Sequence, residues 1–183
     1  MLKAFLSRQL GKMERQFDYD ASYMRQMLNV SPATFVKFGF VTQLVDRKAA
    51  PGELLVAAGI AGTLAEDCGP CTQISVDMAT AHGVDPAILR AILAGDEAAM
   101  GEVAALGWRF ARASMARDME AADPLRDEIV RRWSDKGLMA VSLAVTTARM
   151  YPTLKYALGY GKACSRVTVE GQATPVSHPA LAA

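Results

Sequence analysis

Apolar residues recur every three or four positions along most of the chain, which is the spacing of one face of an α-helix. In the first fifty residues this pattern predicts helices over residues 3–17, 21–28 and 32–45. Ser31 followed by Pro32 is typical of a helix beginning, because serine caps the free N–H groups and proline fits the first helical position. The chain is therefore expected to open with three helices.

Proline and glycine mark where the following helices begin and end. Residues 51–65 are rich in Ala, Gly and Leu, and their small side chains permit close contact between helices. After them we expect helices over residues 68–83, 86–95 and 97–119, one from residue 124, and an apolar pair over residues 138–150 and 152–164. Ser134 or Asp135 is expected to cap that pair, and Pro152 to end or kink a helix.

Strand signals are almost absent from the sequence. Only residues 167–169 are expected to form a short strand or extended segment. Residues 170–183 contain Gly, two prolines and small residues, which is typical of a mobile tail. With no internal repeat and no linker between domains, the predicted fold class is all-α, a single-domain helical bundle.

Composition and charge exclude several functional classes. A chain of 183 residues with 51% hydrophobic and 21% charged residues supports one domain with a sizeable core and excludes bulk disorder. The 20 basic and 19 acidic residues are intermixed without a basic stripe, so no nucleic-acid partner is expected. The longest apolar run, residues 54–65, is shorter than the roughly 20 residues that span a bilayer, so no membrane partner is expected. The first residues lack the continuous apolar core of a secretory signal, and a cytoplasmic location is expected.

The stretch EDCGPCTQ places Cys68 and Cys71 at the start of a predicted helix. One helical turn brings the two side chains together, so the pair can close a disulfide. The free N–H groups and partial positive charge of a helix N-terminus stabilise a thiolate there. A thiolate attacks peroxides and disulfides, and a second thiol resolves the product. No nucleotide or flavin fingerprint is present, and no cofactor is expected.

The two cysteines have three other interpretations. A thioredoxin fold would need strands around the motif, where the periodicity is helical. A zinc site would need two more ligands, for which only His82, His178 and Cys164 are available. The pair could also be incidental core residues, as we expect Cys164 to be.

The spacing along the predicted helix indicates which residues lie on the same face as the two cysteines. Cys68, Cys71, Ser75, Met78 and His82 recur at steps of three and four and so share one face. Cys71 and Ser75 are one turn apart and are expected to touch. His82 lies about 16 Å from Cys71 along the axis, at 1.5 Å per residue, which is too far to serve the dithiol. We expect it instead at the C-terminal end of the helix, where it favours the dipole.

These residues resemble the alkylhydroperoxidase D-like branch of the carboxymuconolactone decarboxylase family. That family is all-helical and carries C-x-x-C-x-x-x-H-x-x-x-A-x-x-x-G, with the cysteines at the N-terminus of a helix. Cys68, Cys71, Ala79 and Gly83 occupy the matching places, and the resemblance covers roughly residues 50–163.

The resemblance implies three parts and a set of partners. The parts are an N-terminal helical extension over residues 1–50, an alkylhydroperoxidase D-like helical core over 51–164 and an extended C-terminal tail over 165–183. It also implies a homo-oligomer, a trimer or hexamer, acting on a peroxide or disulfide substrate with a thioredoxin-like or lipoyl-protein reductant.

Several positions depart from the family's pattern. Ser75 stands where the pattern has histidine, Pro70 where a second histidine can occur, and Val56 where it has glutamate. In place of the family's residues, Glu66, Glu53 or a water held by Ser75 would have to transfer protons to and from the reacting thiol. Serine is not a base near neutral pH, so Ser75 would only position a proton or a water.

The leading hypothesis is a thiol-dependent oxidoreductase, peroxidase-like or disulfide-exchanging, with candidate catalytic residues Cys68, Cys71, Glu66, Ser75 and Glu53. The family's usual assignment makes Cys71 attack the peroxide, whereas the helix dipole alone favours Cys68 as the more exposed nucleophile. We favour Cys71 for peroxide and Cys68 for exchange with the reductant. The alternative is a non-catalytic oligomeric scaffold or a redox-sensing binding module. Lactone decarboxylation is disfavoured, because that branch of the family generally lacks the C-x-x-C.

Overall fold

The computed structural model describes residues 2–161 and 167–177. These residues form an all-α single domain with one short β-hairpin, which confirms the predicted fold class. The elements in chain order are α1 (Leu2–Phe17), α2 (Ser22–Val30), α3 (Pro32–Gly39), the 3₁₀ turn η1 (Phe40–Gln43), α4 (Gly52–Ala65), α5 (Gly69–Ala81), α6 (Pro86–Ala94), α7 (Gly101–Ala116), α8 (Met119–Ala157), β1 (Val167–Val169) and β2 (Gln172–Thr174).

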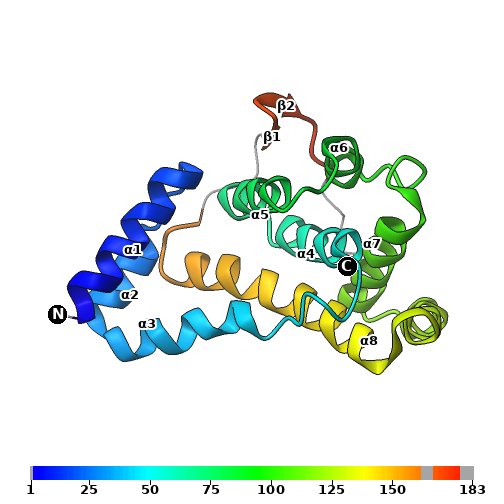
Figure 1. Cartoon of the computed structure of the whole chain (residues 1–183), viewed down its shortest axis with the longest axis horizontal. Coiled ribbons are helices and arrows are strands. Elements are labelled where there is room, and N and C mark those ends of the chain that lie inside the picture. The colour runs from blue at the N-terminus through cyan, green and yellow to red at the C-terminus, as the bar shows by residue number, and fades with distance from the viewer. Residues whose placement is uncertain (1, 162–166, 178–183) are drawn as a thin grey trace.

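Helix α4 lies in the middle of the bundle, between α5, α7 and α8 (Figure 1). Its small residues allow the close helix contact that the sequence predicts: a Cβ atom placed on Gly62 of α4 would lie 3.1 Å from the carbonyl oxygen of Val145 on α8. A Cβ atom placed on Gly107 of α7 would lie only 2.3 Å from the carbonyl oxygen of Leu54, so the two backbones meet without a side chain between them. We call α4 to α8 the helical core.

Helix α8 is bent at Trp133 and Ser134, where the backbone leaves the helical region and Ser134 has a φ of 61°. A helix boundary at Ser134 is therefore confirmed. The expectation that Pro124 starts a helix is wrong, because the Asp118 side chain already caps the chain by accepting from the backbone N–H of Ala121 at 3.0 Å. The expected break at Pro152 is also wrong: this residue is buried inside the second half of α8.

Two further boundaries differ from the prediction. Asp96 caps only a turn, accepting from the N–H of Ala99 at 3.2 Å, and α7 begins later. The reason is Gly101, whose φ of +74° is incompatible with a continuous helix from residue 97. The predicted helix 32–45 likewise divides at Gly39 into α3 and the 3₁₀ turn η1.

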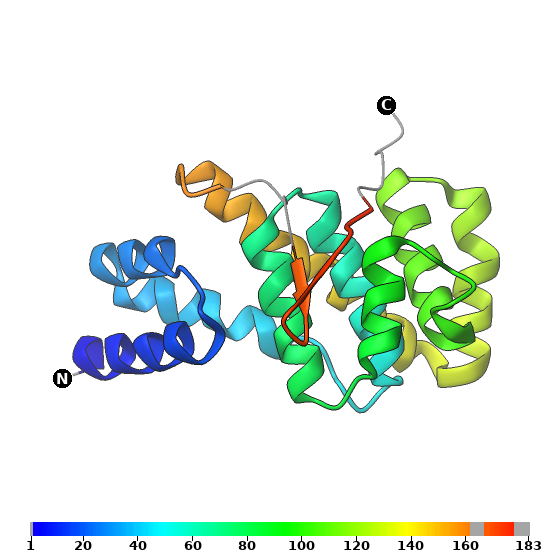
Figure 2. The ribbon, with the colours of Figure 1, turned by 90° about the horizontal axis from the view of Figure 1, so that it is seen from above.

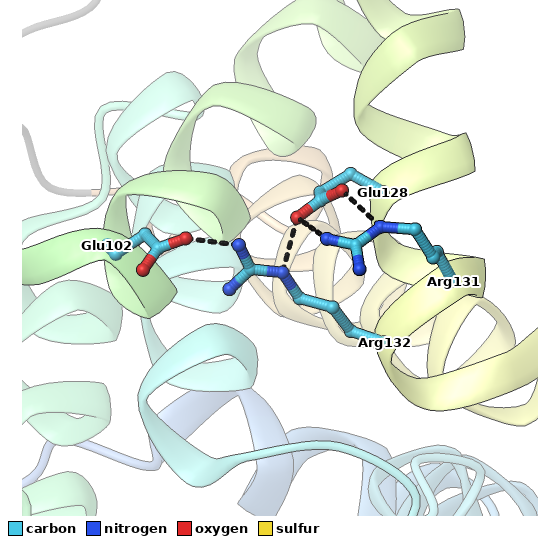
Figure 3. A network of polar contacts seen from close by, with 4 residues as sticks. All are labelled: Glu102, Glu128, Arg131 and Arg132. Atoms are coloured by element: carbon cyan, nitrogen blue, oxygen red, sulfur yellow. Dashed lines mark hydrogen bonds and ion pairs between the residues drawn. The ribbon is translucent and has the colours of Figure 1, made fainter.

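A polar network ties α7 to the first half of α8 (Figure 3). Glu128 accepts from the Nε of Arg131 at 2.9 Å and also pairs with Arg132, which in turn pairs with Glu102 of α7. Hydrogen bonds from both arginines hold the pKa of Glu128 below its ordinary value. The network lies at the surface, far along the molecule from the N-terminal helices.

Helices α1 to α3 stand at one end of the molecule and meet the helical core along α5 and the end of α8 (Figures 1 and 2). They share a second, smaller apolar cluster, which we call the N-terminal cluster. Its buried members are Leu10, Tyr19, Ala21 and Tyr23, packed against partly buried residues that include Ile74 of α5 and Tyr151 and Leu154 of α8.

Strands β1 and β2 pair antiparallel, with Val167 opposite Thr174, and the hairpin lies over α5 and α6 (Figure 2). The backbone N–H of Ser177 donates to the Leu93 carbonyl at 2.7 Å. The expectation of a mobile tail is therefore wrong for residues 170–177, because the pairing of β2 with β1, an ion pair between Glu170 and Arg90 of α6 and the Ser177 hydrogen bond hold them against the bundle. The expectations for Cys164, for His178 and for residues 178–183 lie outside the described residues.

In the described part of the chain, no helix combines the length and the apolar character that crossing a membrane requires.

Candidate functional site

Cys68 and Cys71 lie at the beginning of α5, as the sequence predicts. Cys68 is the residue that precedes the first helical turn, with an extended backbone (φ −107°, ψ 93°), and Pro70 occupies that first turn, where no N–H partner is lost. The two cysteines form a disulfide, and their Cα atoms are 5.3 Å apart, in the ordinary range for such bonds. The expected pairing across one turn is confirmed.

The two cysteines differ in their access to small molecules. Cys68 is 0% exposed and Cys71 is 3% exposed, and of the two Cys71 is the one that lines the cavity beside α5. The expectation that Cys68 is the more exposed of the two is therefore wrong. Cys68 is covered because α5 packs on the end of α4. At this contact the Thr72 hydroxyl donates to the Cys68 carbonyl at 3.1 Å and lies 3.2 Å from the hydroxyl of Thr63. Whatever reaches the disulfide through this cavity meets Cys71.

The cavity beside Cys71 has a volume of about 620 Å³ and is lined by α4, α5, α8, the segment after α3 and the N-terminal cluster. That size is typical of sites for small organic molecules. Tyr19, Tyr23 and Tyr151 line it, and burial raises the pKa of Tyr151 to about 12, against a smaller opposing effect of its hydrogen bond with Thr42. The sequence does not mark these tyrosines as site residues, although Tyr19 and Tyr23 are four positions apart, because no local pattern indicates which face of the N-terminal helices meets α5.

The predicted shared face is confirmed for four of its five members, because Cys68 precedes α5 and does not line the cavity. Cys71, Ser75, Met78 and His82 all line the cavity. Ser75 touches Cys71 as expected, since its hydroxyl donates to the Cys71 carbonyl at 2.9 Å. His82 follows the last residue of α5, and its Nδ1 lies 2.6 Å from the Met78 carbonyl, which assigns the proton to that nitrogen. The predicted position of His82 at the helix end is confirmed.

Neither candidate glutamate lines the cavity. Glu66 directly follows the last residue of α4. Its carboxylate accepts from the Nε of Arg149 on α8 at 2.6 Å and from the hydroxyl of Thr153 at 3.4 Å. Glu53 lies in the first turn of α4, about 20 Å from Glu66 at 1.5 Å per residue. Val56 does line the cavity, so the wall is aliphatic where the family's pattern has a carboxylate.

The hairpin is fastened to α5 within one turn of the disulfide. The Gln73 side chain accepts from the Thr168 N–H at 2.8 Å and donates to the Thr168 carbonyl at 3.0 Å, as a neighbouring strand would. The same amide donates to the Asp77 carboxylate at 2.8 Å. Burial beside the hairpin raises the pKa of Asp77, and the Gln73 hydrogen bond only partly offsets that effect.

Within residues 2–161 and 167–177, no three His, Cys, Asp or Glu side chains gather into a group that could hold a metal ion. Comparisons of the chain with protein-family profiles, with curated proteins and with solved structures find no match. The site is therefore described by its geometry alone: a disulfide at a helix N-terminus, with its second cysteine on the wall of a largely apolar cavity.

Proposed function

We propose that the chain is a thiol-dependent oxidoreductase in which Cys68 and Cys71 cycle between dithiol and disulfide. The observation that supports this most is the disulfide at the start of α5 beside a cavity of about 620 Å³ that Cys71 lines. A structural disulfide across one turn would add little, because the loop that it closes is short and restricts few unfolded conformations. A cavity at such a bond is what a reacting molecule requires.

Cys71 is the proposed nucleophile. In the reduced protein its thiol would stand in the first turn of α5, where the free N–H groups and the helix dipole stabilise the thiolate. The thiolate attacks the outer oxygen of a hydroperoxide, the O–O bond breaks, and the departing alkoxide takes a proton to become an alcohol. Cys71 is left as a sulfenic acid.

Cys68 is the proposed resolving thiol. Its sulfur attacks the sulfenic sulfur, the disulfide forms, and the oxygen leaves as water. A dithiol reductant, such as a lipoyl group or a thioredoxin-like protein, then exchanges with the disulfide and carries away two electrons. The balance is one hydroperoxide and one dithiol converted into one alcohol, one water and one disulfide. Such a cycle suits a reducing compartment such as the cytoplasm.

Ser75 is the proposed positioning residue. Its hydroxyl proton is donated to the Cys71 carbonyl, so its oxygen is left to accept a hydrogen bond from the hydroperoxide or from a water. Glu66 is held by Arg149, and Glu53 lies at the other end of α4. A proton reaching the alkoxide through either glutamate would have to pass along water.

The test is peroxide-dependent oxidation of a dithiol, measured with cumene hydroperoxide and dihydrolipoamide. Cys71→Ser should lower turnover by about a hundredfold or more, because the nucleophile itself is lost. Cys68→Ser should allow one oxidation and leave a trappable sulfenic acid, and Cys164→Ser is the matched control with turnover expected to persist. Equal turnover in the wild type and in Cys71→Ser would contradict the proposal.

A non-catalytic oligomeric scaffold or redox-sensing binding module is the second candidate, and one observation favours it. Helix α3 is strongly apolar yet has no buried residue, and Val30, Phe40 and Leu44 beside it are 79%, 57% and 54% exposed. Such a surface suits contact with a second copy, and the family resemblance would make the assembly a trimer or hexamer. If the protein is an oligomer and its disulfide forms, but it does not turn over a dithiol, that result would favour this candidate over the enzyme.

A further inference from the structure

Seven hydroxyl-bearing residues line the cavity, and most of their hydroxyls already have partners, which leaves few for a ligand. Tyr19 donates to the Tyr23 hydroxyl at 3.3 Å, and Tyr151 is hydrogen-bonded to Thr42. Four of the seven hydroxyls donate to carbonyls of their own helix or turn: Thr42 to Gly39 at 3.1 Å, Thr63 to Ile60 at 3.0 Å, Ser75 to Cys71 at 2.9 Å and Thr147 to Leu143 at 2.8 Å. With its proton engaged in this way, a threonine presents mainly its methyl group. The remaining wall is rich in aliphatic and methionine side chains, so most of the cavity suits an apolar chain.

The charge in the cavity wall is positive and comes from Arg47. Arg47, in the segment between η1 and α4, lines the cavity and is also exposed, which places it at the opening. Among the described residues no acidic side chain lines the cavity, and none lies within ion-pair distance of Arg47. The guanidinium is planar and carries several donors, which match a carboxylate.

We propose that the cavity binds an amphipathic carboxylate, with its apolar chain along the methionine and aliphatic wall and its head group on Arg47. Resting on the function proposed above, the ligand that reacts is then the hydroperoxide of a fatty-acid-like chain, presented to Cys71. A volume of about 620 Å³ accommodates such a chain, whereas hydrogen peroxide would make few contacts in it.

The experiment measures binding of unreactive probes to the oxidised protein by calorimetry. Octanoate, 1-octanol and octylammonium share one chain and differ in head group. We expect octanoate to bind most tightly and octylammonium most weakly. Arg47→Gln should lower the affinity for octanoate about fivefold, the upper end of the effect of a solvent-accessible ion pair. It should leave the affinity for 1-octanol unchanged. The matched control is Lys48→Gln, which removes the same charge from an exposed neighbour that does not line the cavity.

A second variant locates the chain. Met78→Trp enlarges a wall residue on α5 and should weaken all three probes together. Equal affinities for octanoate and octylammonium, an unchanged octanoate affinity in Arg47→Gln, or no binding of any probe would each overturn the inference. Octanoate binding that depends on Arg47, in a protein without peroxide turnover, would leave this inference standing and reject the proposed function.

Discussion

The helical core and the N-terminal cluster are stabilised by different interactions. The core buries a continuous set of aliphatic side chains, many of them alanines, and lets α4 and α7 approach until Gly107 meets the Leu54 carbonyl. The N-terminal cluster buries only four residues, two of them tyrosines whose hydroxyls lie 3.3 Å apart. It adds an ion pair between Glu14 and Arg25 on the two helices that it joins.

A buried lysine marks the contact between the two regions. Lys155 on α8 is only 2% exposed, and its ammonium lies 4.9 Å from the ring centroid of Tyr19 and 5.4 Å from that of Tyr23. Such contacts between a cation and aromatic faces contribute about 0.5–2 kcal/mol each, less than close aliphatic packing over a whole helix. The cavity lies along this contact, so the core carries the disulfide while the weaker region supplies part of the wall around it.

The largest expected effect is in the core. Gly107→Ala would place a Cβ atom 2.3 Å from the Leu54 carbonyl oxygen, so a buried backbone would have to shift to relieve the clash. We expect a loss of about 3 kcal/mol or more in the free energy of unfolding, at the upper end of the cost of overpacking. Urea unfolding followed by circular dichroism measures it.

Gly39→Ala is the matched control, because a Cβ atom there meets nothing within 4 Å and the residue is helical in α3. It should be neutral or slightly stabilising, by up to about 1 kcal/mol. Similar losses in both glycine variants would show that the close contact between α4 and α7 does not set the stability of the core.

The next effect is alkaline opening of the N-terminal cluster. Burial raises the pKa of Tyr19 and Tyr23 above the usual 10.0 and that of Tyr151 to about 12. A tyrosine with a raised pKa in the folded state adds stability below pH 10.0, and that stability is lost as the pH rises towards about 12. The cluster should therefore open before the core.

Because the chain has five tyrosines, the late part of the tyrosinate absorbance change is the part that reports on the buried Tyr19, Tyr23 and Tyr151. The emission maximum of Trp108 and Trp133 reports on the core, which holds both tryptophans of the chain. We expect this late absorbance change to occur at a lower pH than the shift of the emission maximum. Tyr23→Phe should reduce the late absorbance change and leave the emission unaltered. If absorbance and emission change together, the two regions unfold as one unit.

The smallest effect concerns Asp77, beneath the hairpin. Its pKa is raised in the folded state by burial, so its contribution to stability is present below the unfolded pKa of 3.8 and is lost as the pH rises through the folded value. Asp77→Asn keeps an oxygen to accept from Gln73 but carries no charge. It should stabilise the protein at neutral pH by less than about 1 kcal/mol, after allowance for solvent screening, and give no gain near pH 3.

Urea unfolding at both pH values measures the difference, with Asp127→Asn on the exposed surface of α8 as the control. A gain of equal size at both pH values would assign the effect to something other than the carboxylate charge.

The sequence predicted the helices and their caps well where the signal is local. Ser31 caps α3 as predicted, because its side chain reaches the N–H group of Thr34, three residues ahead. Two of the predictions that failed, a helix start at Pro124 and a helix end or kink at Pro152, treated proline as a helix boundary. A helix held by packing along its whole length tolerates one missing hydrogen bond.

The amino-acid sequence by itself determined the all-α class, the disulfide across one turn and the shared face of Cys71, Ser75 and His82. These follow from spacing along one helix, which involves only near neighbours. Tertiary structure alone decided that Cys68 is covered, that Glu66 is paired with Arg149 and that Arg47 joins the cavity wall. Each of those outcomes depends on which faces of distant helices meet, and that is set by packing of the whole chain rather than by any local pattern.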